Sequence, residues 1–419
     1  MKSIQGIRGF SDIYENIEQW QGIENILCQI ADQYAYEEIR TPYCEPTTLF
    51  ERSIGITSDI VHKEMYTFTD KNEQSISLRP EGTASVVRAC IEKNLLYDQT
   101  RKFYYMGSMF RRERPQKGRL RQFNQFGMEC LGYPEPYPDT EQLIIIHNIW
   151  KKLSISENIK LEMNYLGSRE TRIKYGSALK NYYQPFKNKM SELNQKRLDE
   201  NTLRLLDSKD EFLIDINKNA PSIDEYYTKE ESDSFLKIQK ICEDHEIKYQ
   251  VNKTLMRGLD YYTGLIYEWK CESLGAQSTI CGGGRYDLLF ENLGQEAQPA
   301  CGFSIGIERL IELVKGQKYL EKKKIIAMIA MNQENIQDIM QHAERIREDC
   351  KNIKVHTHFE NGKIQTMIKK ALKKKAKFMI LYGENEKKDN TFTIKNLDTK
   401  EQRTVNYKEL IDMIRSDYD

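Results

Sequence analysis

Basic side chains crowd residues 103–130 in a spacing that suits the binding of anions. Between Arg111 and Arg121 the chain has six basic residues and one acid, Glu113, with a proline and a glycine that mark a turn. Arginine grips a phosphate at two points and stays charged at any working pH. The loop therefore suits phosphates or the end of a nucleic acid, although exposed hairpins also carry such charges simply as solvated surface.

Two strands must hold this loop, and the second one presents a mixed polar and aromatic face. The residues on both sides of the loop read as strands. On the second strand, the period of two places Phe123, Gln125 and Glu129 on one face. Aromatic, amide and carboxylate groups on one face are what a small-molecule site needs.

A second acid stands where a strand gives way to a helix. Residues 75–79 alternate as a strand, and the sequence PEGT breaks it before an apolar helical segment. The break places Glu81 and Thr83 at the amino terminus of the helix. Glu81 could act there only as an acid favoured by the helix dipole, which contributes about 0.3–1 kcal/mol.

Three further segments carry residues that could take part in chemistry. They are LMRGLDYY (255–262), CGGGRYD (281–287) and GFSIGIERLIEL (302–313). Three consecutive glycines allow a ligand to approach the backbone closely, though a tight turn would need them equally. The third segment reads as a strand, a glycine break and an amphipathic helix, with Arg309 in its first turns. An arginine at that place could also be simply exposed.

Any nucleotide would have to be held by such residues, because the chain has neither a P-loop nor a Rossmann glycine pattern. The overall charge gives no help, since 63 basic residues balance 63 acidic ones. Locally the balance differs: from Lys322 to Asp419 there are 21 basic residues and 15 acidic ones. RNA contacts are therefore expected to rely on local patches.

The cysteines and histidines give no sign of a metal site. Nine cysteines are scattered without a CxxC pair, so they read as reduced thiols rather than a zinc ribbon or a disulfide scaffold. His356 and His358 lack a third ligand at a recognisable spacing. The amino terminus lacks the apolar core of a signal peptide, and no apolar run approaches the ~20 residues that span a bilayer. We expect a cytoplasmic protein without membrane contact.

The elements that position these motifs fall into two domains. An amphipathic helix is expected from about Trp20 to Tyr34, followed by a strand-like segment with Pro42. Residues 168–249 are rich in Lys, Asn, Glu and Ser and read as a helical insertion in a first domain, 1–320. A polar linker follows, and residues 322–419 alternate as strand, helix, strand, helix, strand, which predicts a small α/β domain.

The motifs together resemble one family. FRRE, the basic loop and the following strand resemble motif 2 of the class II aminoacyl-tRNA synthetases, and GFSIGIERLIEL resembles motif 3. The segments LRPEGTA, RPQKGRLRQFNQFGMECLG, LMRGLDYY and CGGGRYD are similar to histidyl-tRNA synthetases, of class IIa. The resemblance implies an α+β fold: an antiparallel sheet of six or seven strands flanked by helices, a helical insertion, and a C-terminal α/β anticodon-binding domain.

The resemblance also implies roles for particular residues. Arg111 and Arg257 would hold the α-phosphate of ATP and stabilise the transition state. Histidine would be bound by Glu81, Thr83, Gln125, Glu129, Tyr261 and Tyr262. ATP would be bound by Arg111, Glu113, Arg121, Phe123 and Arg309. The acceptor end of the tRNA would meet Arg114 and Gln116. Mg²⁺ would screen the triphosphate, and no protein metal site is implied.

The helix from about Trp20 to Tyr34 and the segment 38–42 resemble motif 1 of the class II synthetases, which builds the dimer interface in that family. The implied activity is ATP-dependent activation of histidine and its transfer to the 3′ end of tRNA(His), by a homodimer built through this motif. One alternative is a regulatory subunit of ATP phosphoribosyltransferase, which resembles the same catalytic core but neither aminoacylates nor carries the anticodon domain. The intact LMRGLDYY segment, the arginines and the basic C-terminal part favour the synthetase. Another class IIa synthetase would not combine Glu129 with RGLDYY.

Overall fold

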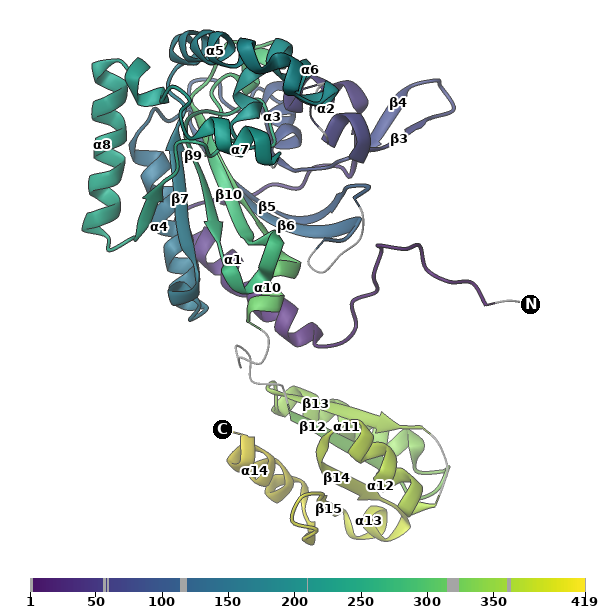
Figure 1. Ribbon diagram of the computed structural model, residues 1–419. Helices are drawn as coiled ribbons and strands as arrows, with labels where there is room; N and C mark the ends of the chain where they lie inside the picture. Colours follow the sequence, from purple (N-terminus) through teal and green to yellow (C-terminus); the bar gives the residue numbers. More distant parts are fainter. Residues whose placement is uncertain are drawn as a thin grey trace. The chain divides into compact units, whose positions relative to one another are not determined.

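The computed structural model describes residues 3–55, 58, 60–113, 119–208, 210–314, 324–359 and 363–418. The chain divides into two compact units, Met1–Tyr319 and Leu320–Asp419 (Figure 1). No helix within the described ranges combines the length and apolar character needed to cross a membrane.

A large sheet forms the centre of the first unit. Among the described residues it has eight strands, in the order β1-β5-β6-β11-β10-β9-β7-β8. They are β1 (Glu37–Glu38), β5 (Arg101–Phe110), β6 (Gln122–Leu131), β7 (Lys160–Tyr165), β8 (Tyr249–Val251), β9 (Thr263–Lys270), β10 (Thr279–Arg285) and β11 (Ala300–Gly306). The six central strands are antiparallel, as expected. The sheet is wider than expected because the short strands β1 and β8 pair in parallel with its two edges.

The β5–β6 hairpin shows how the residue pattern produces the sheet. The two strands pair along their whole length, ten residues each. On β6 the alternating residues Phe126 and Met128 are fully buried in the core. Phe123 and Gln125, at the intervening positions, are partly exposed. The period of two thus sends one set of side chains into the core and leaves the other set for the site.

Three helices supply most of the helical residues of the larger core, which they form together with the sheet. They are α1 (Ile17–Gln33), α4 (Tyr137–Lys152) and α10 (Ile307–Leu313). Apolar residues at helical spacing, such as Ile23 and Leu27 of α1 and Ile146 and Trp150 of α4, pack there without exposure. Each large apolar side chain buried in this way contributes roughly 1.5–3 kcal/mol of transfer free energy.

Helices α3 (Thr83–Glu92) and α9 (Leu289–Asn292) belong to a second core, built partly from the residues around the site. Helix α2 (Thr47–Ile54) packs against α3 and contributes to a third, smaller core. Beside these helices lies a sheet of three short strands in the order β2-β4-β3, with β2 (Cys44–Pro46), β3 (Tyr66–Thr69) and β4 (Ser75–Leu78). Strand β4 leads directly into α3, so it delivers Glu81 to the amino terminus of that helix.

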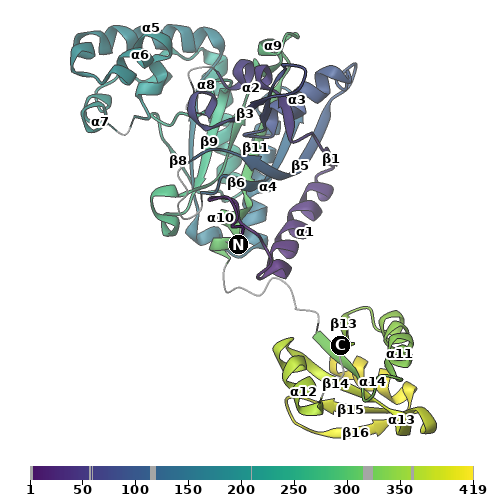
Figure 2. The ribbon, with the colours of Figure 1, turned by 90° about the vertical axis from the view of Figure 1, so that its right-hand side faces the viewer.

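A helical region is inserted between β7 and β8. Its α-helices are α5 (Arg169–Tyr183), α6 (Glu192–Glu200), α7 (Glu211–Asn217) and α8 (Lys229–Asp244), with a short 3-10 helix η4 (Thr202–Leu205) between α6 and α7. Helices α5, α6 and α7 lie together at one end of the first unit in both views (Figures 1 and 2). Buried residues of this part of the insertion, including Tyr175 of α5, Leu198 of α6 and Leu205 of η4, belong to the same core as Tyr262 and Tyr286. The inserted region is therefore packed directly on the site.

The second unit is an α/β domain, as its alternating pattern predicts. Its sheet has the order β13-β12-β14-β15-β16. The strands are β12 (Lys324–Ala330), β13 (Ile353–His358), β14 (Ala376–Tyr382), β15 (Phe392–Asn396) and β16 (Gln402–Val405). The helices are α11 (Ile336–Asp349), α12 (Ile364–Lys373), α13 (Glu384–Asp389) and α14 (Tyr407–Tyr418). Alternate residues of β12 enter separate cores on the two faces of the sheet.

Candidate active site

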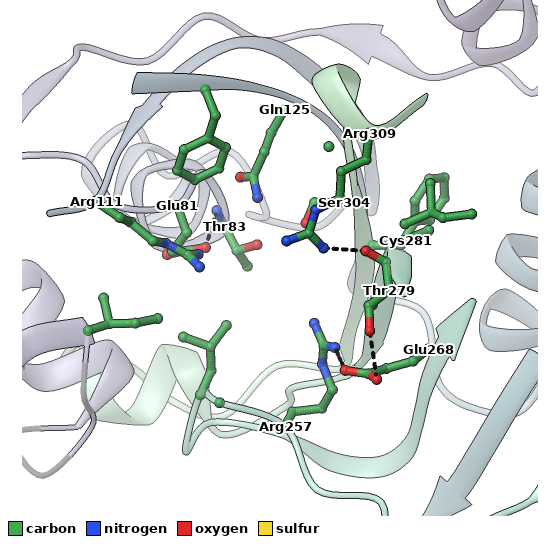
Figure 3. A pocket seen from close by; sticks show the side chains of 18 of the residues that line it. Glu81, Thr83, Arg111, Gln125, Arg257, Glu268, Thr279, Cys281, Ser304 and Arg309 are labelled. Carbon is green, nitrogen blue, oxygen red and sulfur yellow. Dashed lines mark hydrogen bonds and ion pairs between the residues drawn. The ribbon is translucent and has the colours of Figure 1, made fainter. Parts of the chain in front are cut away.

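A cavity of about 330 Å³ lies over the sheet of the first unit. It is lined by side chains from β6, β10, β11 and α10, from the start of α3, and from the segment between β8 and β9 (Figure 3). Besides Arg309 of α10, the structure brings together nine of the predicted site residues along its wall. They are Glu81, Thr83, Arg111, Glu113, Phe123, Gln125, Arg257, Tyr261 and Tyr262. Arg309 of α10 lines the same cavity.

Glu81 is fixed by the helix that follows it. Its carboxylate accepts hydrogen bonds from the backbone N–H groups of Thr83 and Ala84, both at 2.8 Å. These are free donors of the first turn of α3, which is why an acid before the helix adopts this position. Burial nevertheless raises the pKa of Glu81, because it penalises the charged form. A cationic group that enters the cavity would favour the charged carboxylate.

Glu129 lies behind the wall of the cavity. Its carboxylate accepts a hydrogen bond from Thr83 Oγ1 at 2.7 Å and another from the hydroxyl of Tyr286, and the residue is 0% exposed. Burial raises the pKa of Glu129 to about 8. Thr83 and Tyr286 line the cavity and Glu129 does not. Direct contact of Glu129 with a ligand stays a prediction.

Three arginines enter the cavity from different elements. Figure 3 shows Arg111, Arg257 and Arg309 pointing into it from three sides. Arg111 donates from Nε to the carbonyl of Pro80 at 2.9 Å and lies 5.4 Å from the ring centre of Phe123. Arg309 donates to the carbonyl of Thr279. The guanidinium groups are thus oriented by the protein and face a common space, which suits a ligand with several negative charges.

Arg257 is held by Glu268, a residue of β9 that the sequence motifs did not single out. The two side chains form an ion pair. Glu268 also accepts from the hydroxyl of Thr279 at 3.1 Å and lies 3.4 Å from Nζ of Lys270. Burial acts against its charge, but the neighbouring Arg257 and Lys270 hold the pKa of Glu268 below its ordinary value. The carboxylate therefore stays ionised and fixes the direction of Arg257.

Glu308 is a second site residue that sequence reasoning missed. It precedes Arg309 on α10, and its Oε1 accepts from the backbone N–H of Asn124 at 2.8 Å and from Nδ2 of Asn124 at 3.0 Å. Burial raises the pKa of Glu308 to about 7. Asn124 stands between Phe123 and Gln125, so this contact ties the helix with Arg309 to the strand that carries two other site residues.

Two tyrosines of the LMRGLDYY segment form an aromatic cluster with Tyr286. The ring centres of Tyr261 and Tyr262 are 4.9 Å apart, and those of Tyr261 and Tyr286 are 5.7 Å apart. All three residues line the cavity. Tyr286 belongs to the CGGGRYD motif, which the sequence analysis noted for its glycines and not for this side chain.

Glu113 and Arg121 both have partners within the protein. Glu113 forms an ion pair with Arg119, and both line the cavity. Arg121 is not part of the lining, because its side chain donates to the backbone carbonyls of Glu113 and Arg8, both at 3.3 Å. Arg114 and Gln116 lie outside the described residues.

Comparison with known proteins places the chain in a family. A family model described as Histidyl-tRNA synthetase matches residues 9–310. The chain belongs to the histidyl-tRNA synthetase family. A second model, described as Anticodon binding domain, matches residues 324–417. The resemblance inferred from the motifs, and the class II fold that it implies, are thereby confirmed.

Solved structures of the family agree with this assignment. The histidyl-tRNA synthetase of S. aureus, in its apo form, is 31% identical with a TM-score of 0.82, over 98% of this chain and 99% of that one. The histidyl-tRNA synthetase of Nostoc sp. PCC 7120 is 18% identical with a TM-score of 0.68, over all of both chains. A Bacillus halodurans C protein described as an ATP phosphoribosyltransferase regulatory subunit/histidyl-tRNA synthetase has a TM-score of 0.63 at 18% identity, over 88% of this chain and 97% of that one. The last two likenesses concern the fold alone.

Proposed function

We propose that the protein is an active histidine–tRNA ligase, which activates L-histidine with ATP and transfers it to the 3′ end of tRNA(His). The observation that carries this proposal is the convergence of Arg111, Arg257 and Arg309 on one cavity beside Glu81. Activation brings a carboxylate to a triphosphate, so positive groups must offset the repulsion between two anions. A protein that only bound histidine would have no need for three oriented arginines.

The histidine subsite would use the acids and tyrosines at the floor of the cavity. The ammonium group of histidine would meet Glu81, Thr83 and Gln125. Its imidazole would meet Tyr262 and Tyr261, with Glu129 acting directly or through the Thr83 and Tyr286 hydroxyls that it holds. An apolar analogue would leave these buried polar groups unpaired, which is the strongest basis for rejecting a substrate.

Activation would follow from the arginines. The carboxylate of histidine attacks the α-phosphorus of ATP, a new P–O bond forms, and pyrophosphate leaves. Arg111 and Arg257 would hold the α-phosphate and stabilise the charge that grows on its oxygens. The adenine ring would stack on Phe123 and donate a hydrogen bond from its amino group to Glu113, and Arg309 would meet the ring or the outer phosphates. Arg121 would have to leave its backbone partners to do the same.

Mg²⁺ would reach this site with its nucleotide. Among the described residues, no three His, Cys, Asp or Glu side chains gather as a metal site. The cavity carboxylates Glu113 and Glu268 are both already paired with arginines. Magnesium bound mainly by substrate phosphates needs few protein ligands. The residues present therefore fit MgATP as a substrate, whose metal offsets part of the triphosphate charge.

The second step would use both units of the chain. Arg114 and Gln116 would contact the acceptor end of tRNA(His), and residues 324–417 would bind its anticodon, as the matching family model suggests. We also propose a homodimer that acts in the cytoplasm, where its nine free cysteines would stay reduced.

ATP–pyrophosphate exchange, measured with each of the twenty amino acids and without tRNA, tests the proposal. Exchange with histidine alone is expected. Exchange with another amino acid would overturn the pocket assignment. No exchange at all would favour the regulatory-subunit function. The description of the Bacillus halodurans protein names such a subunit, and the fold of that protein is similar to that of this chain.

A further inference from the structure

The segment between β8 and β9 carries three site residues but has little structure of its own. Arg257, Tyr261 and Tyr262 all line the cavity, and residues 255–262 contain neither helix nor strand. Such a segment keeps its shape only through bonds to its surroundings. The partners of those bonds therefore decide where the site residues stand.

One set of partners comes from the inserted helical region. Oδ1 of Asp260 accepts hydrogen bonds from Nε and Nη2 of Arg204, at 3.0 and 2.7 Å. The same oxygen accepts a third bond from Nδ2 of Asn201, at 3.0 Å. The Arg204 and Asp260 side chains are only 17% and 26% exposed, so water screens this pair less than a surface ion pair. Asn201 and Arg204 lie at the turn between α6 and α7, some 56 to 59 positions from Asp260.

The inserted region holds the same segment at a second point. Arg172 of α5 donates from Nη1 to the backbone carbonyl of Tyr262 at 2.9 Å. Asp260 and Tyr262 are two residues apart, and both contacts lie outside the cavity lining, which contains neither Arg172 nor Arg204. Two arginines of the insertion thus grip the segment from its outer side.

The end of helix α2 completes the clamp. The backbone N–H of Asp260 donates to the carbonyl of Ile54, the last residue of α2, at 3.3 Å. The other carboxylate oxygen of Asp260 lies against Gly55, where an added Cβ would stand 2.5 Å from it. Asp260 is therefore confined between α2 and the insertion, and its freedom to move is small on both sides.

We propose that Arg204 and Asp260 are positioning residues for activation: the inserted region uses this pair to hold Arg257 and Tyr262 in the cavity. The expected effect on the rate of activation rests on the proposed function. The contacts that hold residues 255–262 do not, because they lie within the chain itself. Arg204 touches no substrate and acts through Asp260, while Asp260 acts through the backbone on either side of it.

Kinetics of Arg204→Ala, Arg204→Lys and Asp260→Asn provide the first test. In ATP–pyrophosphate exchange with histidine, Arg204→Ala is expected to lower kcat roughly tenfold or more, because small misplacements of a catalytic group cost that much. The KM for ATP should change much less. Arg204→Lys should restore part of the rate. The double variant Arg204→Ala, Asp260→Asn should be no slower than the slower single variant, because residues that act through one contact are not additive.

Arg169→Ala is the matched control. Arg169 also joins the insertion to the core, through an ion pair with Glu291 of α9, but it makes no bond to residues 255–262 among those described. It should leave kcat unchanged. Equal losses in Arg169→Ala and Arg204→Ala, or additive losses in the double variant, would overturn the proposal, because both would indicate a general effect of a damaged insertion.

Hydrogen–deuterium exchange of the ligand-free full-length chain gives a readout that needs no activity. Arg204→Ala should speed amide exchange in peptides that cover residues 255–262, while its melting temperature stays close to that of the wild type. Arg169→Ala should leave amide exchange in these peptides unchanged. Unchanged exchange in these peptides would overturn the clamp. A wild-type chain without pyrophosphate exchange would instead contradict the proposed function. Hydrogen–deuterium exchange would still test the clamp, because it needs no activity.

Discussion

Glu81, Glu129 and Glu268 show how differently burial acts on acids within a few ångströms of one cavity. Glu81 and Glu129 are buried and Glu268 is mostly buried, and burial by itself favours the neutral form. Glu268 has two cationic neighbours and its pKa is lowered, whereas Glu129 has only hydroxyl donors and its pKa rises to about 8. The same residue type can therefore fix an arginine in one position and act as a neutral hydrogen-bonding group in another.

Glu129 should make stability depend on pH. Its pKa in the folded chain is about 8, against an ordinary value of 4.5, so between these values the folded state keeps a proton that the unfolded state has lost. The free energy of unfolding should therefore fall as pH rises through this window, by at most about 1.4 kcal/mol per pH unit. Glu129→Gln removes the titration, and urea unfolding between about pH 5 and 8 should show a smaller slope than the wild type.

Glu92→Gln is the control for this prediction. Glu92 ends α3, the helix whose first residue, Thr83, contacts Glu129, but its side chain is 51% exposed. Its replacement should leave the slope as it is. Equal slopes in the wild type and Glu129→Gln would show that Glu129 is already ionised at neutral pH in the folded chain.

Arg257→Ala should remove activation without unfolding the chain. Loss of a donor aimed at the charge of the transition state typically costs roughly 10²–10³-fold in rate, so pyrophosphate exchange should fall by about that factor. Glu268 keeps Lys270 and Thr279 as partners in the variant. Histidine binding, measured by calorimetry, should remain. Lys253→Ala is the control, since Lys253 is exposed nearby and pairs with Asp224; near-normal exchange in Arg257→Ala would contradict the assigned role.

The sequence was informative about residues that belong to contiguous motifs. Glu81, Gln125 and Arg257 could be proposed because their neighbours along the chain identify them. Glu308 could not, because its role in the site depends on a hydrogen bond with Asn124, 184 positions away. Glu268 was missed for a similar reason: a single acid in an apolar strand shows nothing of its partner until the loop before the strand folds back on it.

At the scale of elements, strand β10 explains two of the three consecutive glycines. The sequence left a tight turn and a close approach as equal possibilities, and β10 is in fact a strand between β9 and β11. A Cβ at Gly282 would collide with the guanidinium of Arg257, and one at Gly283 would collide with the carbonyl of Gly302. One glycine thus leaves room for a site residue and the next for the neighbouring strand.

Gly282→Ala should consequently lower activity, whereas Gly283→Ala should lower stability. In Gly282→Ala the obstacle is the far end of a flexible side chain, so Arg257 should move, pyrophosphate exchange should fall, and the melting temperature should change little. In Gly283→Ala the obstacle is backbone, and overpacking of that kind costs roughly 1–3 kcal/mol. Thermal unfolding and exchange rates of the two variants check this. A stable, fully active Gly282→Ala would show that Arg257 needs no such space.

Helices and strands could be predicted where the periodicity of apolar residues is clear. They could not be predicted where a segment becomes a strand only by pairing with a neighbouring strand. The β5–β6 hairpin follows from alternation of Phe126 and Met128 with more polar neighbours. A strand is expected at residues 38–42, but only Glu38 of that segment belongs to the two-residue strand β1. The three-residue strand β8 is not expected from the sequence, and both edge strands depend on pairing with their neighbours β5 and β7. The packing of the insertion on the site was not predicted, since its charged residues are explained most simply by solvated helical faces and otherwise by contact with tRNA.

For the whole molecule, the division into two units separates the proposed activation site from the unit proposed to bind the anticodon. All cavity residues lie in the first unit, and the second unit has hydrophobic cores on both faces of its own sheet. A compact unit with its own core can fold alone. Contacts with phosphates, which dominate RNA affinity and weaken with salt, can then be lost without damage to the chemistry of activation.

A chain that ends at Tyr319 should therefore keep pyrophosphate exchange but lose most aminoacylation of tRNA(His). Loss of the unit that matches the anticodon-binding model should raise the KM for tRNA by roughly tenfold or more, since each 1.4 kcal/mol of lost contact is a factor of ten. Both assays, run at two salt concentrations, check the prediction, and circular dichroism shows whether each unit folds alone. The separate unit 320–419 added back in excess serves as a control, because without a covalent link it should restore little. If the shortened chain lost activation and aminoacylation equally, the second unit would be needed to build the site in the first, and the two steps would not be separable.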